Sequence, residues 1–153
     1  MDEEIKMKKE FVMRGKTEKG LTEVLNFSGY KPGYAYRLTE FELFQSNIAS
    51  GVDAQLCAII TAGKTALDPQ SPDFSLEECI ATAIYENDAA DHNQIAAFSV
   101  INDTFLITQN LLLTVFNTES HAINWQCRFV AVKMNKPEEA VANYKQFTIS
   151  DGS

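Results

Sequence analysis

The clearest alternation of apolar and polar residues in this sequence lies between Ala122 and Met134. The apolar positions are Ile123, Trp125, Cys127 and Phe129, and the polar positions between them are Asn124, Gln126 and Arg128. Successive side chains of a β-strand point to opposite faces, so this period of two predicts a strand with one buried face.

The same period begins at Tyr34 and slips once. Apolar side chains recur at Tyr34, Tyr36 and Leu38, and they recur again at Phe41 and Leu43. One extra residue, near Thr39-Glu40, moves every later side chain to the other face of a regular strand. The slip therefore predicts a β-bulge inside one long strand.

Further strand-like runs are separated by turn residues. They are Leu21–Phe27, Asp53–Thr61, Ile95–Ile101, and Thr104–Phe116 with a kink near Gln109-Asn110. Leu76–Tyr85 is ambiguous, since Ser75-x-x-Glu78 resembles a helical capping box. The β-branched and aromatic residues that follow favour a strand.

The two ends of the chain differ from the strand-rich middle. Asn135, Pro137 and the acidic pair after it predict a short C-terminal helix over residues 137–147, with Val141, Tyr144 and Phe147 as its apolar stripe. Residues 1–20 show no sustained apolar period, and we interpret them as an extended or loosely ordered arm. The remaining residues, 21–153, then form one domain.

Six to eight strands with short connections and a single helix predict an all-β fold, an antiparallel β-sandwich. A jelly roll is the version we name first. Strand count alone leaves other Greek-key sandwiches open.

The length of 153 residues and the apolar fraction of 45% suit one globular domain. The net charge is −8, which disfavours a general nucleic-acid-binding face. The N-terminal arm is an exception to this acidic character, because residues 5–19 contain six basic residues and only two acidic ones. These cations are candidates for contact with nucleic acid or a neighbouring subunit: Lys6, Lys8, Lys9, Arg14, Lys16 and Lys19.

The residue types needed for catalysis are sparse. Cys57, Cys79 and Cys127 form no metal-binding spacing, and we expect buried free thiols. His92 and His121 both fall in predicted loops, without a nucleophile motif nearby. We expect no enzyme, no catalytic residue and no cofactor. The loop that holds Asp88, Asp91 and His92 has the donors for a divalent metal, but a solvated acidic loop is the simpler interpretation.

Aromatic residues gather between Tyr30 and Phe44, at Tyr30, Tyr34, Tyr36, Phe41 and Phe44. Aromatic rings on an open face bind sugars or other ligands, so a carbohydrate- or ligand-binding module is an alternative function. At strand spacing such rings more often belong to the core or to an interface.

Three runs in the last third of the chain carry a resemblance to a known group. They are the run from Val100 to Leu111, the strand from Ile123 to Phe129, and the ending Ala142-Asn143-Tyr144-Lys145-Gln146-Phe147. Together they resemble virion structural proteins of marine phages. The resemblance implies a small β-sandwich, often a jelly roll, that builds or decorates a capsid, and it transfers no active-site residue.

The expected partners are therefore copies of the chain itself, other capsid proteins and, through the arm, weakly held nucleic acid. The charged opening Asp2-Glu3-Glu4-Ile5-Lys6 does not resemble a signal peptide, and the apolar runs are too short to span a bilayer. We expect synthesis in a host cytoplasm, assembly into a virion and no membrane partner.

Overall fold

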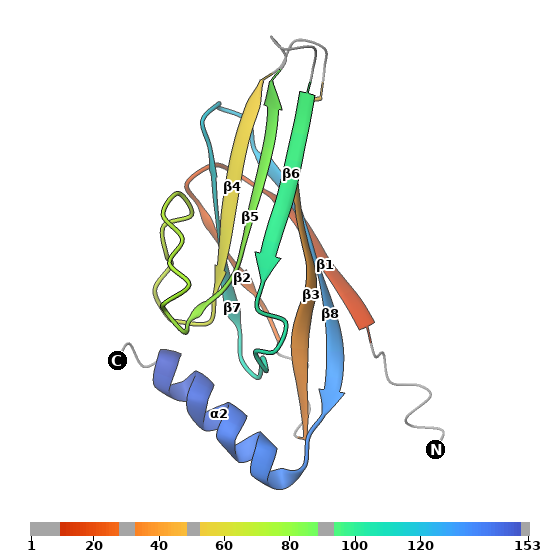
Figure 1. Cartoon of the computed structure of the whole chain (residues 1–153), viewed down its shortest axis with the longest axis vertical. Coiled ribbons are helices and arrows are strands. Elements are labelled where there is room, and N and C mark those ends of the chain that lie inside the picture. Colours follow the sequence, from red (N-terminus) through yellow and green to blue (C-terminus); the bar gives the residue numbers. More distant parts are fainter. Residues whose placement is uncertain (1–9, 28–32, 49–52, 89–93, 151–153) are drawn as a thin grey trace.

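In the computed structural model, residues 10–27, 33–48, 53–88 and 94–150 are described, and they form eight strands and one helix (Figure 1). The strands are β1 (Glu10–Thr17), β2 (Thr22–Leu25), β3 (Tyr34–Gln45), β4 (Ala54–Thr61), β5 (Cys79–Asp88), β6 (Gln94–Ile101), β7 (Leu111–Asn117) and β8 (Ile123–Lys133). The helix, α2, spans Lys136–Ser150. The predicted all-β fold with a C-terminal helix is confirmed.

Two antiparallel sheets form a sandwich. One has the strand order β1-β8-β3 and the other β2-β7-β4-β5-β6. β4 pairs with β5, β2 pairs with β7 and β1 pairs with β8. These are pairs that form when a row of eight strands is folded in half between its fourth and fifth strands. These nested pairs are those of a jelly roll.

One pair departs from that scheme. Continued nesting would pair β3 with β6, but β6 remains in a hairpin with β5 and extends the larger sheet. Figure 1 shows β6 lying alongside β3 on one side of the sandwich. Both strands are edges, so the sandwich is open along this side.

The core lies between the two sheets and follows the predicted alternation. In β8 the side chains of Ile123, Trp125, Cys127 and Phe129 are buried, as the period of two requires. The bulge in β3 is confirmed, because its register with β8 shifts between Leu38 and Glu40. The ambiguous segment is also settled: Cys79–Asp88 is a strand.

The predicted run Thr104–Phe116 is only partly a strand. Within the run, β7 begins at Leu111, and residues 104–110 form an irregular connection with one isolated bridge between Tyr36 and Ile107. Side-chain oxygens hold this connection: Asn102 Oδ1 accepts from the Thr104 N–H at 3.2 Å, and Asn110 Oδ1 accepts from the Phe27 N–H at 2.7 Å. Asparagine side chains that bond to the backbone compete with a strand ladder.

The N-terminal arm is also corrected, because residues 10–17 belong to the sandwich. β1 pairs along its whole length with β8, and Phe11 and Met13 pack against the core. The Phe11 ring stacks on Phe129, with centroids 5.3 Å apart. Alternate apolar side chains face inward here, while Arg14 and Lys16 face solvent. In the described residues the domain therefore starts at residue 10 rather than 21.

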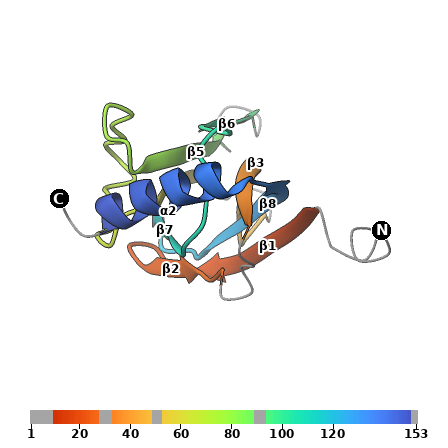
Figure 2. The ribbon, with the colours of Figure 1, turned by 90° about the horizontal axis from the view of Figure 1, so that it is seen from below.

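Helix α2 crosses one end of the sandwich (Figure 2). Its N-cap is as predicted, since Asn135 Oδ1 accepts from the Glu138 N–H at 2.9 Å. The predicted apolar stripe is wrong at two positions: Val141 and Tyr144 are exposed. The side chain of Phe147 lies outside the described residues.

The buried positions of α2 are Ala142, Gln146 and Ile149, spaced as one helical face. Gln146 replaces an apolar residue there because its Oε1 accepts three hydrogen bonds. The donors are the Thr108 N–H at 2.6 Å, the Thr108 hydroxyl at 3.0 Å and the Gln109 N–H at 3.1 Å. Among the described residues, no helix has the length and apolarity needed to cross a bilayer.

Candidate functional site

The strongest candidate site is the free edge of β6. Every side chain from Ile95 to Val100 is exposed. In the other described strands, at most three consecutive side chains are exposed. Ile95 is 60% exposed, Phe98 59% and Val100 49%. A strand that exposes large apolar groups and an unpaired backbone edge is a template for pairing with another strand.

The other three edge strands carry features that discourage such pairing. β1 has Glu10, Arg14 and Lys16, and β2 is only four residues long and contains Glu23. β3 has Glu40 and Glu42 next to its bulge. Charges, bulges and short lengths are the usual protection of sheet edges. β6 has eight residues, no charge and an unbroken register with β5.

The exposed apolar surface continues from β6 onto β5. In the register of this hairpin, Ile84 lies opposite Phe98 and Thr82 lies opposite Val100. Ile84 is itself exposed. We call Ile84, Phe98 and Val100 the β6 patch.

A groove of about 450 Å³ lies on the open side of the sandwich, between β3 and the β5–β6 hairpin. Phe44, Ile84 and Phe98 are among the residues that line it. Gln45 of β3 links the two sheets, because its Oε1 accepts hydrogen bonds from the Tyr85 hydroxyl at 3.1 Å and from Asn87 Nδ2 at 2.9 Å. These hydrogen bonds connect β3 to β5 and do not involve β6.

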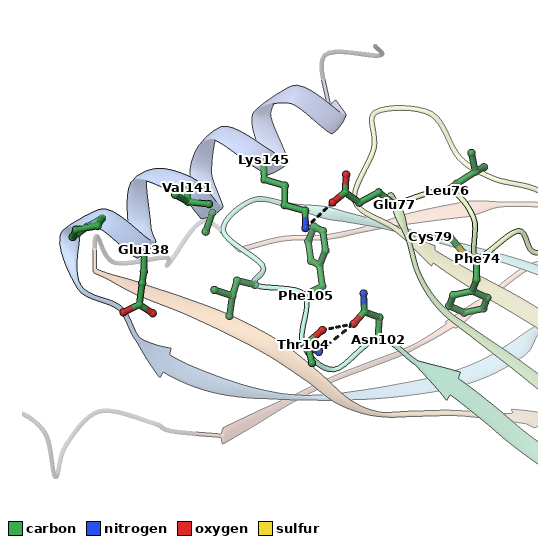
Figure 3. Close-up of a pocket in the computed structure, with 13 residues that line it drawn as sticks. Phe74, Leu76, Glu77, Cys79, Asn102, Thr104, Phe105, Glu138, Val141 and Lys145 are labelled. Atoms are coloured by element: carbon green, nitrogen blue, oxygen red, sulfur yellow. Dashed lines mark hydrogen bonds and ion pairs between the residues drawn. The ribbon is translucent and has the colours of Figure 1, made fainter.

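A larger hollow, of about 650 Å³, lies beside α2 (Figure 3). Its walls are mostly apolar: Phe74, Leu76, Phe105, Leu106, Val141 and Ala142. Lys145 Nζ lies 2.6 Å from Glu77 Oε1 and 5.9 Å from the centroid of the Phe105 ring. The Lys145 ammonium group neutralises the Glu77 carboxylate, and the Glu138 carboxylate also lines the hollow.

The candidate cations do not form one surface. Arg14 and Lys16 lie on the outer face of the three-stranded sheet, which also carries Glu40 and Glu42. Lys19 Nζ lies instead 5.9 Å from the centroid of Phe116, on the outer face of the other sheet. Lys6, Lys8 and Lys9 lie outside the described residues. The three described cations are therefore divided between opposite faces.

The aromatic residues proposed for ligand binding are also separated. Phe41 is buried, and Tyr36 is half-buried against Phe11, with ring centroids 5.3 Å apart. Phe44 is 50% exposed and lies on the opposite face of β3. Tyr30 lies outside the described residues. Tyr34 is half-buried and lies on the same face of β3 as Tyr36. Of the described rings only Phe44 is exposed, so they share no open face.

The proposed metal loop is described only at Asp88, which is exposed at the end of β5. Asp91 and His92 lie outside the described residues. Within the part of the chain that the structure describes, no three His, Cys, Asp or Glu side chains are grouped closely enough to hold a metal ion.

The three cysteines are free thiols, with Cys79 and Cys127 buried and Cys57 half-buried. Burial and the nearby Asp68 carboxylate raise the pKa of Cys57 to about 11. Burial also raises the pKa of Cys79 and Cys127. Thiolates are the reactive form, so these groups are poor nucleophiles at neutral pH.

We therefore expect slow thiol modification in the folded protein. At pH 8 the thiolate fraction of Cys57 should be roughly 100-fold below that of an ordinary cysteine. Timed reaction with a chromogenic disulfide, in buffer and in urea, measures this. All three thiols should react rapidly only in urea, and fast release of one equivalent from the folded protein would contradict the prediction.

No protein-family model matches this sequence, and no curated protein matches it. A solved structure with some similarity is a seed lectin of Lotus tetragonolobus, at 8% identity, covering 81% of this chain and 94% of the lectin chain, with a TM-score of 0.23. So low a TM-score supports no inference about this chain.

The β6 edge was not identified from the sequence, although a signal for it exists. That signal is the absence of charge in the predicted strand Ile95–Ile101, but the predicted run Thr104–Phe116 is also uncharged, and the exposure that distinguishes β6 is known only from the structure.

Proposed function

We propose that this protein is a structural protein of a phage virion, which assembles with copies of itself or onto other capsid proteins through the edges of its sheets. The observation that carries the proposal is the uncharged, exposed edge of β6 together with the β6 patch. The jelly-roll pairing of the strands and the resemblance of the last third of the chain support it.

Assembly at this edge also suits the charge of the protein. Two copies with a net charge of −8 repel each other, and the repulsion falls as salt screens it. An uncharged strand lets acidic copies meet with few like charges apposed. We therefore expect association to strengthen between low and moderate ionic strength.

The test is the particle mass of the purified protein, measured by light scattering at several salt concentrations, with negative-stain microscopy of the same samples. Oligomers, rings or shells of defined size that grow with salt support self-assembly. Binding to a purified capsid would support the decorating role instead. A protein that stays a 17.1 kDa monomer at every salt concentration and binds no capsid would overturn the proposal.

Nucleic acid is a separate part of the same experiment. Co-purifying nucleic acid that is released by salt would indicate contact through the cationic segment. Because Arg14 and Lys16 lie on a different face from Lys19, we expect any such contact to be weak.

A further inference from the structure

We infer that two copies of this chain pair through β6, antiparallel and about a two-fold axis at Phe98, so that their five-stranded sheets join into one sheet of ten. This inference rests on the proposed function, because it names the partner and the contact for self-assembly.

The backbone of β6 determines which residues can bond to a partner. The Asn102 N–H donates to the Ile80 carbonyl oxygen at 2.8 Å, at the end of the β5–β6 hairpin. In an antiparallel ladder the direction of the backbone groups alternates along the strand. The N–H and C=O groups of Ile95, Ala97, Ser99 and Ile101 therefore point away from β5, towards the free edge.

A two-fold axis then allows few registers. Residues whose backbone groups face the partner must lie opposite each other, so Ala97 can pair with Ser99 but not with Phe98. An axis at Phe98 places Ile95 opposite Ile101, Ala97 opposite Ser99 and Ala96 opposite Val100. This register pairs the whole described length from 95 to 101.

The side chains fit the same arrangement. Every cross-strand pair is uncharged, and two Phe98 rings meet at the axis, where cross-strand aromatic pairs stabilise a sheet. The two β6 patches become one apolar surface across the joint. Phe98 sits at a non-hydrogen-bonded position, where opposite Cα atoms are only ~4.5 Å apart.

The occupant is a second copy of this edge rather than the edge of β3. β3 carries Glu40, Glu42 and a bulge, and a bulge twists an edge away from regular pairing. β6 is matched only by a strand that is equally long, straight and uncharged, and among the described edges that strand is β6 itself.

Cysteine cross-linking tests the register. Upon mild oxidation, Phe98→Cys should convert completely to a disulfide-linked dimer. The separation between the two opposite Cα atoms at this position suits a disulfide. Val100→Cys is the matched control: it lies on the same strand and face with similar exposure, but it faces Ala96 of the other copy. It should give no dimer above that of the native protein.

A mixture provides the sharper result. Ala96→Cys and Val100→Cys should each stay uncross-linked alone but form a dimer when mixed. Cross-linking of Val100→Cys alone, or no cross-linked dimer of Phe98→Cys, would overturn this pairing.

Lysine substitution separates this inference from the proposed function. Phe98→Lys should abolish the dimer, because it places two like charges opposite each other. Val24→Lys, at an equally exposed apolar position on the far edge strand β2, should leave it intact. If the native protein assembles but Phe98→Lys assembles equally well, the β6 contact is wrong and the proposed function stands. If the native protein remains a monomer, the β6 pairing is wrong, and the proposed function fails with it only if the protein also binds no purified capsid.

Discussion

Replacing Phe129 with alanine should destabilise the protein by about 3–5 kcal/mol, the cost of deleting a large buried aromatic side chain. Phe129 is fully buried at the middle of β8, the central strand of its sheet. Its ring stacks on Phe11 of β1 and meets Phe27 edge-on at 5.1 Å. The substitution therefore leaves a cavity where the N-terminal strand joins the core.

Urea unfolding followed by tryptophan fluorescence measures this effect, and thermal unfolding should show a fall in Tm of roughly 10 °C. Phe44→Ala is the matched control, because it removes the same ring from a half-exposed position in β3. Its cost should stay below about 1 kcal/mol. Equal effects of the two substitutions would contradict the packing described for Phe129.

The strands could be predicted because their signals are local. Alternation in Ile123–Phe129 and the slip near Glu40 depend only on neighbours in the sequence, and both appear in β8 and in the bulge of β3. The order of strands depends on pairings between distant segments. No local pattern shows that β6 stays with β5 instead of pairing with β3.

β1 was missed because its inward side chains are few and varied. Phe11, Met13, Gly15 and Thr17 do alternate with exposed residues, but only two of the four are apolar. The cations between them gave the segment the composition of a solvated arm. The alternation is present, but glycine and threonine occupy two of its inward positions and leave only two apolar residues to indicate it.

The helix α2 shows a similar limit. A stripe of Val141 and Tyr144 satisfies helical spacing, but the face that meets the sandwich is set by the close approach of Ala142 and the hydrogen bonds of Gln146. A buried glutamine is recognised only when the donors from Thr108 and Gln109 are known. These donors are almost forty residues away, so local sequence does not reveal them.

Gly15 provides the second large effect and tests whether β1 belongs to the sandwich. Gly15 lies directly opposite Trp125 in the register of β1 and β8. A Cβ atom added there would lie 2.7 Å from Trp125 Cζ2 and 3.0 Å from Cε2. The indole has little freedom to move away, since its Nε1–H donates to Thr17 Oγ1 at 2.9 Å.

Gly15→Ala should therefore cost about 1–3 kcal/mol, as overpacking of a filled site does. Gly63→Ala is the control, because its added Cβ would meet its nearest neighbour at an ordinary 3.7 Å. In a Trp125→Leu background, which lacks the clashing ring atom, the cost of Gly15→Ala should shrink, and a double-mutant cycle measures that coupling. If residues 10–17 were a free arm, Gly15→Ala would leave the urea midpoint unchanged in both backgrounds, followed here by circular dichroism because Trp125 is the only tryptophan. A shift that vanishes with the indole instead places this strand against the core.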